Sequence, residues 1–225
     1  MINLNGLASL LFASMELILL INLLIFSEKN KINIMVFVLV GILTVYQGLE
    51  FLMCNLNLKY SFLAYLAFSD ISFLPPLNLF FILKYFNRNH KLNKALFIPA
   101  AAFAVYYYMV LDKFAVVSCS VLYASYSYPL GTFYGFFYYT PVIYAIIFLT
   151  NRIKKTKDEL KKKLAKVLLG GLLFVSLPVI AAFILLAVHN ESLLAIIESV
   201  MCKFAFVYAV CLGYFTLLNK KAVYE

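Results

Sequence analysis

Seven long runs of apolar residues follow one another along the chain, separated by polar segments. A helix needs about 20 apolar residues to cross the hydrocarbon core of a bilayer, and each run reaches or approaches that length. Most connections are short, so neighbouring helices are expected to pack antiparallel. The pattern predicts an all-α integral membrane fold, a single domain (1–225) that forms a seven-transmembrane helix bundle. The predicted spans are 6–26, 32–53, 61–83, 95–111, 131–150, 167–188 and 193–218.

The composition supports a membrane protein. Hydrophobic residues make up 65% of the chain, charged residues 13%, and the mean hydropathy is +0.95. Soluble domains usually have about half of their residues apolar and about a quarter charged. The first run lacks the basic region and cleavage motif of a signal peptide and is too long for its apolar core. We therefore interpret this run as the first span.

Lysine and arginine are distributed unequally between the two sides of the predicted bundle. An excess of these residues marks the cytoplasmic side. One side has only Lys59 and Lys113, and the other has sixteen basic residues. This asymmetry predicts a multi-pass protein of the plasma membrane with its N-terminus outside and its C-terminus in the cytoplasm. The sixteen are Lys29, Lys31, Lys84, Arg88, Lys91, Lys94, Arg152, Lys154, Lys155, Lys157, Lys161, Lys162, Lys163, Lys166, Lys220 and Lys221.

The net charge of +9 is explained by the same loops. Cationic cytoplasmic loops meet anionic lipid headgroups, with a contribution of about 1 kcal/mol for each charge near the surface. The lipid bilayer is thus the expected partner, and nucleic acid is not expected. The longest basic connection runs from Arg152 to Lys166 and is expected to extend a neighbouring helix. It is either a solvated, lipid-facing loop or the docking site of a cytoplasmic partner.

Five ionisable side chains fall within the predicted spans, where charge is costly and marks candidate functional sites. They are Glu16, Glu50, Asp70, Glu198 and Lys203, and Gln47 precedes Glu50 on the same helix face. In the predicted topology all five lie between the outer interface and the midplane. We expect a polar cavity that opens outward. Tyrosines gather at the same level, where they also form interfacial belts: Tyr60, Tyr65, Tyr106, Tyr107, Tyr108, Tyr123, Tyr126, Tyr128, Tyr134, Tyr138 and Tyr139.

The buried charges have three interpretations. Lys203 is expected to pair with Asp70, Glu16 or Glu198. In a structural interpretation this pair orients the helices, and Glu50 is exposed at the interface. In the other two, the charges line a cavity for a small ligand, or they form a path for protons or ions.

Two adjacent prolines, Pro75 and Pro76, interrupt the third span. Their rings clash with the preceding turn and free the carbonyls of Ile71 and Ser72. Broken membrane helices are tolerated where the backbone lines a cavity or finds a neighbour. The break follows Asp70, so we expect it to help shape the polar cavity.

Two of the four cysteines, Cys54 and Cys119, fall on the outer side of the predicted membrane. Disulfides persist outside the cytoplasm. A bridge between the two would attach the long loop of residues 112–130 to the second span.

Catalytic and cofactor motifs are not found in the sequence. Neither His90 nor His189 has a partner at metal-ligand spacing, and phosphate-binding and nucleophile motifs are absent. We therefore expect neither enzyme activity, nor a cofactor, nor a metal.

Several stretches resemble the N-terminal seven-transmembrane sensor region of bacterial membrane histidine kinases and diguanylate cyclases. They are "VYQGLEFLM", "LAYLAFSDISFLPPLNLFFILKYFNR", "LFIPA" and "GTFYGFFYYTPVIYAIIFLTNRI". The family typically has a glutamate in its second span and prolines in the third and at the start of the fourth. Glu50, Pro75, Pro76, Pro99 and Tyr85 occupy the matching places. The tryptophans common in that family are absent here. Because the sequence ends soon after the seventh predicted span, the resemblance implies either an excised sensor domain or a stand-alone relative that signals through another protein.

The resemblance implies a receptor-like sensor that signals through a cytoplasmic or membrane partner. Its ligand would be a small molecule or lipid in the outer cavity. A small transporter or a structural subunit of a membrane complex is the alternative. A retinal-binding photoreceptor would share the topology and the lysine in the last span, but it usually sandwiches its chromophore between tryptophans.

Overall fold

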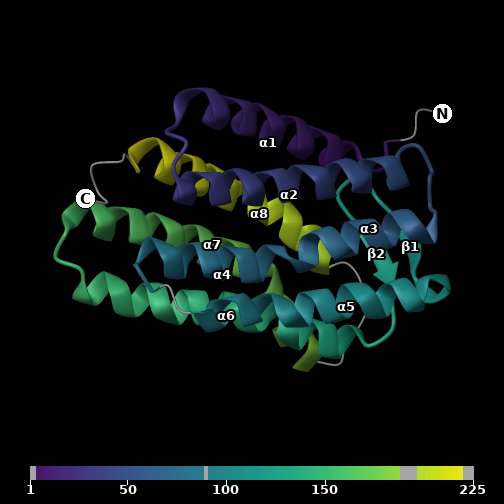
Figure 1. Cartoon of the computed structure of the whole chain (residues 1–225). Helices are drawn as coiled ribbons and strands as arrows, with labels where there is room; N and C mark the ends of the chain where they lie inside the picture. The colour runs from purple at the N-terminus through teal and green to yellow at the C-terminus, as the bar shows by residue number, and fades with distance from the viewer. Residues whose placement is uncertain (1–3, 89–90, 188–196, 220–225) are drawn as a thin grey trace.

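The computed structural model describes residues 4–88, 91–187 and 197–219, with the side chains of all of these except 91–92, 181–187 and 197–198. The chain is a bundle of helices lying roughly parallel or antiparallel to one another (Figure 1). Its helices are α1 (Leu7–Phe26), α2 (Lys31–Cys54), α3 (Ser61–Ser72), α4 (Leu74–Tyr85), α5 (Ile98–Met109), α6 (Gly131–Lys155), α7 (Glu159–Ala187) and α8 (Ile197–Leu218). Short 3₁₀ helices, η1 (Lys91–Phe97) and η2 (Leu111–Lys113), flank α5.

Six helical segments of the described chain are long and apolar enough to cross a membrane. They are Leu7–Phe26, Lys31–Cys54, Ser61–Tyr85, Gly131–Lys155, Glu159–Ile180 and Ser199–Leu218. They correspond to six of the seven predicted spans. The prediction of an all-α membrane bundle is confirmed at this level. The end of the sixth predicted run at residue 188 and the start of the seventh at 193 lie outside the described residues.

The remaining predicted span, 95–111, differs from the expectation. Its α-helical part is α5, which has 12 residues and is therefore about 18 Å long. This is shorter than the hydrocarbon core of about 30 Å. Pro99 stands in the first turn of α5, where proline begins a helix readily but does not continue a preceding one. The preceding seven residues form η1 instead, which adds about 14 Å of tighter helix.

The third predicted span breaks where its prolines stand. Helix α3 ends at Ser72, and α4 begins at Leu74 with prolines in its first turn. At the break, the backbone N–H of Phe73 bonds to the carbonyls of Asp70 and Ile71, and the Ser72 hydroxyl donates to the carbonyl of Phe68 at 2.6 Å. The same hydroxyl lies 3.0 Å from the hydroxyl of Tyr134 in α6. The break is thus held against a neighbouring helix.

A small antiparallel hairpin, which an all-α prediction omits, occupies the loop between α5 and α6. Strand β1 (Ala115–Cys119) pairs with β2 (Ala124–Ser127), with a bulge between Val116 and Ser118. The strands contain Val116, Val117 and Tyr126, and β-branched and aromatic residues favour strands. The hairpin lies at the end of the bundle where α2 ends and α3 and α6 begin (Figure 1).

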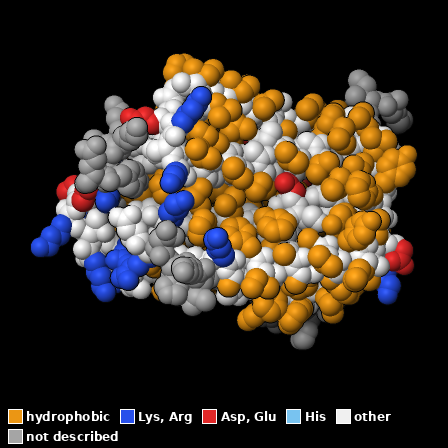
Figure 2. Space-filling view, viewed as in Figure 1, with side chains coloured by type: hydrophobic (Ala, Val, Ile, Leu, Met, Phe, Trp, Pro, Cys, Tyr) orange, Lys and Arg blue, Asp and Glu red, His pale blue; other side chains and the backbone are white. Residues whose placement is uncertain are grey.

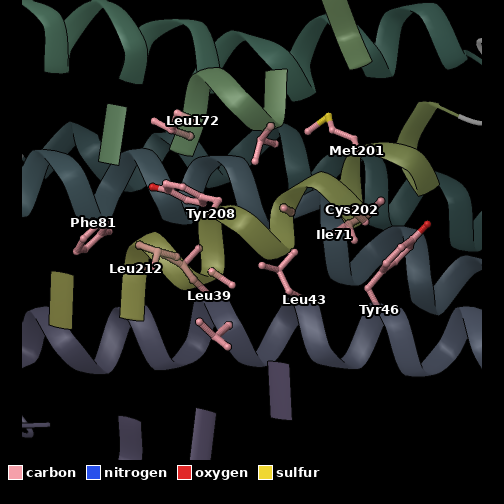
Figure 3. Packing of buried hydrophobic residues seen from close by; sticks show 14 of the residues in the cluster. Leu39, Leu43, Tyr46, Ile71, Phe81, Leu172, Met201, Cys202, Tyr208 and Leu212 are labelled. Carbon is pink, nitrogen blue, oxygen red and sulfur yellow. The ribbon is translucent and has the colours of Figure 1, made fainter. Parts of the chain in front are cut away.

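Helix α8 packs against α1, α2 and α7. Side chains of α2, α7 and α8 point into a common apolar core (Figure 3). Across from α4, the Tyr208 hydroxyl donates to Asn78 Oδ1 at 2.6 Å. The Phe215 and Phe81 rings meet edge to face with centroids 5.2 Å apart. These contacts attach α8 to α4 as well.

Helix α1 buries only a narrow stripe. Its buried residues are Ser9, Glu16 and Leu23, spaced by seven, and two of the three are polar. Leu19 and Leu20 are partly buried against the core, and most of its other leucines and isoleucines are exposed. Exposed hydrophobic side chains cover the middle of the molecule, and Lys and Arg gather toward one end (Figure 2). Such an apolar belt is expected of a surface that faces lipid.

Candidate functional site

The centre of the candidate site is an ion pair between α2 and α8. Lys203 Nζ lies 2.7 Å from Glu50 Oε1 and donates to Gln47 Oε1 at 2.8 Å. Gln47 in turn donates through Nε2 to the carbonyl of Cys202 at 3.0 Å. Glu50 and Gln47 are fully buried, and Lys203 is nearly so. The i, i+3 spacing on α2 places both partners of the ammonium on one face.

This pairing corrects the expected partner of Lys203. Asp70, Glu16 and Glu198 were the expected partners, and Glu50 was expected to be exposed in the structural interpretation. Glu50 is instead completely buried. The reason is tertiary, since α2 packs directly on α8 and brings the face of Gln47 and Glu50 against Lys203.

Two serines complete the coordination of the Glu50 carboxylate. Ser9 of α1 donates to Oε1 at 2.8 Å, and Ser199 of α8 donates to Oε2 at 2.9 Å. Charge in a low-dielectric interior is tolerated only when it is paired and hydrogen-bonded, and both conditions are met here. The sequence analysis did not predict these serines. Their spacing was the available signal, because Ser9 precedes Glu16 by two turns and Ser199 precedes Lys203 by one.

The hairpin is bonded to this buried network. The backbone N–H of Ala124, at the start of β2, donates to Ser199 Oγ at 3.1 Å. The hydroxyl of Tyr46, one turn before Glu50 on α2, lies 3.5 Å from that of Tyr126. A continuous chain of polar contacts therefore runs from the hairpin backbone through Ser199 and Glu50 to Lys203.

The hairpin is also fastened to the ends of α1 and α2. A disulfide joins Cys54, the last residue of α2, to Cys119 of β1, with Cα atoms 5.5 Å apart. Gly6 donates its backbone N–H to the carbonyl of Ser120 at 2.8 Å, and Ala8 does the same to Val121 at 3.2 Å. Gly6 has φ +72°, and a side chain there would meet Cβ of Cys54. Only glycine fits this position easily.

Glu16 lies beside the network without joining it. It is fully buried, and neither of its carboxylate oxygens has a hydrogen-bond partner among the described residues. The positive charge of Lys203 interacts electrostatically with the Glu16 carboxylate. The ammonium thus has one bonded carboxylate, Glu50, and one nearby carboxylate that is not bonded.

Asp70 and Glu198 are not brought into the network by the described structure. Asp70 is partly buried, and its Oδ2 has no hydrogen-bond partner among the described residues. Glu198 lies in the first turn of α8, but its side chain is outside the described part of the chain. Among the described side chains, Glu50 is bonded to Lys203 and Glu16 interacts with it electrostatically.

The described cavities lie elsewhere than the sequence analysis expected. A cavity of about 330 Å³ lies between α4, η1, α5 and α6, and its lining is mainly apolar, with three prolines (Pro76, Pro99 and Pro141). Ser72 and Pro76, at the break, thus border an apolar cavity whose lining includes neither Glu50 nor Lys203. The physical reason is close packing, since the hydrogen bonds of Glu50 and Lys203 hold α1, α2 and α8 together.

Tyrosines at the hairpin end of the bundle form a packed cluster with phenylalanines. Phe68 of α3 lies at its centre, with the Tyr128 ring 4.4 Å away and the Phe114 ring 5.0 Å away. Tyr107 and Tyr134 also pack against it. These rings attach the hairpin to α3, α5 and α6.

A second polar contact joins α2 and α8 at the opposite, basic end. Asn219, just after α8, donates through Nδ2 to Asn33 Oδ1 at 2.8 Å, and both side chains are buried. The amide pair was not predicted, because the sequence analysis searched the spans for ionisable residues.

The basic connection from Arg152 to Lys166 is helical on both sides. Helix α6 continues to Lys155, and α7 begins at Glu159. Asp158 accepts from the backbone N–H groups of Leu160 and Lys161, which is the bonding of a helix N-cap. The helical extension expected here is confirmed.

Among the residues with described side chains, groups of three or more His, Cys, Asp or Glu that could hold a metal ion are not found. Neither a family model, nor a curated protein, nor a solved structure matches the chain. The resemblance to bacterial sensor regions therefore stays a prediction.

Proposed function

We propose that the chain is a receptor-like sensor module with seven transmembrane helices, its N-terminus outside and its C-terminus in the cytoplasm of a plasma membrane. Helix α5 with η1 would supply the seventh crossing. Two observations support this orientation. Basic residues flank the ends of α4, α6 and α7 at one end of the bundle, and the Cys54–Cys119 disulfide lies at the other. Disulfides persist in oxidising surroundings, and basic loops remain in the cytoplasm.

The observation that carries the proposed function is the polar chain from the hairpin to α8. Ala124 donates a hydrogen bond to Ser199, Ser199 donates one to Glu50, and Glu50 is paired with Lys203. A small molecule or lipid that binds at the hairpin would change the position of Ser199 and so weaken one bond to the ion pair. A movement of α8 would also move its other end, where Asn219 is hydrogen-bonded to Asn33. A cytoplasmic or membrane partner bound at that end would receive the signal.

A switch needs two packings that the ligand distinguishes by affinity. Glu16 supplies the second arrangement, because its buried carboxylate lies near Lys203 and has no hydrogen-bond partner among the described residues. In one packing Lys203 pairs with Glu50, and in the other it would pair with Glu16 of α1. Exchange of the ammonium between two carboxylates would rotate or tilt α8 relative to α1 and α2.

Distances at the basic end of the bundle test this coupling. Spin labels at Lys155→Cys in α6 and Leu217→Cys in α8, in a Cys202→Ala/Cys211→Ala background, would report the position of α8. Ser199→Ala removes the bond to the hairpin. Ser9→Ala is the matched control, because Ser9 also donates to Glu50 but has no hydrogen bond to the hairpin in the described structure.

We expect Ser199→Ala to shift or broaden the distance distribution more than Ser9→Ala does, because both variants remove a bond to Glu50 and only Ser199→Ala also removes the bond to the hairpin. Equal distributions in the two variants would mean that the hairpin is not coupled to α8. The buried charges would then be structural, and the interpretation as a subunit of a membrane complex would move ahead.

A further inference from the structure

Two hollows lie at successive levels between α4 and α6. The apolar cavity described above, of about 330 Å³, is bordered by Pro76, Phe103, Tyr138 and Pro141. A second hollow of about 470 Å³, the basic pocket, lies nearer the basic end and is lined by Leu83, Asn87, Arg88, Asn93, Phe148 and Arg152, with Tyr144. The α4–η1–α6 side of the bundle thus offers an apolar region and a cationic region on one line.

The basic pocket has the chemistry of an oxyanion site. It contains two guanidinium groups and two amides and no carboxylate among its lining residues. The Arg152 guanidinium stacks on the Phe148 ring at 5.0 Å and lies 5.9 Å from the Phe86 ring. Asn93 donates to the carbonyl of Arg88 at 2.7 Å, which fixes that turn. A guanidinium held in this way can donate two parallel hydrogen bonds to a phosphate.

The spacing of the two hollows suits an amphiphile. Pro76 and Leu83 on α4 are seven residues apart, as are Pro141 and Phe148 on α6, and seven residues of α-helix rise about 10 Å. An acyl chain that leaves a headgroup in the basic pocket would run along this line into the apolar cavity. Basic pockets between membrane helices on the cytoplasmic side are where anionic headgroups bind.

We propose that this side of the bundle binds an anionic phospholipid. Arg88 and Arg152 hold its phosphate, and the cavity between α4, α5 and α6 holds one of its acyl chains. The site rests on the proposed orientation, which places both arginines at the inner leaflet, and not on the signalling role. It is separate from the Glu50–Lys203 network, so either proposal can fail alone.

Native mass spectrometry of the purified full chain with added phosphatidylglycerol tests the site. Phosphatidylcholine with the same chains and inorganic phosphate serve as comparison probes. The test variants are Arg88→Gln and Arg152→Gln, and the matched control is Lys154→Gln/Lys155→Gln. The control removes two charges from the same end of α6 without touching the pocket. Ala100→Phe, which fills the apolar cavity, tests the acyl chain independently.

We expect phosphatidylglycerol to bind more tightly than phosphatidylcholine. Each arginine variant should weaken its binding at least about tenfold, because hydrogen bonds between charged groups are the strong ones, and the lysine control should bind nearly as the parent does. An equal loss of affinity in the lysine control would mean that the lipid responds to surface charge alone, and the proposed site would be wrong. Competition by inorganic phosphate at comparable affinity would mean that a free anion, not a lipid, is the ligand. If Ala100→Phe binds phosphatidylglycerol as tightly as the parent does, the acyl chain does not occupy the apolar cavity, and that part of the proposal is wrong.

Discussion

Lys203 Nζ lies 2.7 Å from Glu50 Oε1 and joins α8 to α2 across 153 positions of the sequence. Both side chains of the pair are buried. Gln47 accepts a further hydrogen bond from Lys203, and Ser9 and Ser199 donate hydrogen bonds to Glu50. Breaking a buried pair leaves an uncompensated charge, whereas replacing both partners by apolar groups is often neutral. This asymmetry gives the first prediction.

Glu50→Gln should destabilise the fold by about 3–5 kcal/mol, because Lys203 then loses the carboxylate to which it is bonded. The double variant Glu50→Leu/Lys203→Met should recover most of that loss. Unfolding in mixed detergent, followed by circular dichroism, measures both. A double variant as unstable as the single one would show that the stability comes from the hydrogen bonds rather than from charge pairing.

Glu16→Gln should behave differently from Glu50→Gln. Since Glu16 accepts no hydrogen bond within the described residues, its amide should change the stability by no more than about 1 kcal/mol. Under the switch proposed above, it should also narrow the distance distribution between α6 and α8, because the second arrangement of Lys203 is lost. A loss of stability as large as that of Glu50→Gln would assign Glu16 a structural role instead.

Removal of the disulfide should loosen the hairpin. The bridge closes a segment with a sequence separation of 65, and such cross-links usually stabilise by about 2–4 kcal/mol. Cys119→Ser should therefore lower the thermal midpoint and expose the hairpin to protease. A mobility shift of the parent on reduction checks that the bridge is present, and labelling of both residues as thiols without a reductant would contradict it.

The proposed topology makes a prediction about the two ends of the η1–α5 segment. Lys94 and Lys113 should lie on opposite sides of the membrane if α5 with η1 is a crossing. In intact cells, an impermeant maleimide should label Lys113→Cys and leave Lys94→Cys unlabelled until the cells are opened, and Lys155→Cys is the cytoplasmic reference. Labelling of both positions from the outside would reduce the number of crossings to six.

The bundle was predictable because lipid leaves few choices. Each run of about 20 apolar residues must satisfy its backbone internally and so becomes a helix, and six of the predicted spans correspond to such helices. The pair of prolines likewise located the break between α3 and α4. The predicted span at 95–111 is not one continuous α-helix. It begins in a 3₁₀ helix and continues as an α-helix that has Pro99 in its first turn.

The candidate site was predictable in its members but not in its partners. Glu16, Gln47, Glu50 and Lys203 stood out in the sequence because polar groups at membrane depth are rare. Ser9 and Ser199 did not, since single serines are common in membrane helices and only their distance to Glu50 reveals them. Spacing along one helix says which side chains share a face, but not which face meets which neighbour.

The sequence by itself determined the membrane class, the positions of most helices and the charge asymmetry between the two ends, because these depend on local hydropathy and short-range backbone bonding. Only the tertiary structure decided that Lys203 belongs to Glu50 rather than to Asp70, and that the hairpin is bonded to the buried charges. It alone placed Arg88 beside Arg152 in one pocket. In each case the deciding quantity is the rotation of one helix against another, which the packing of the whole bundle sets.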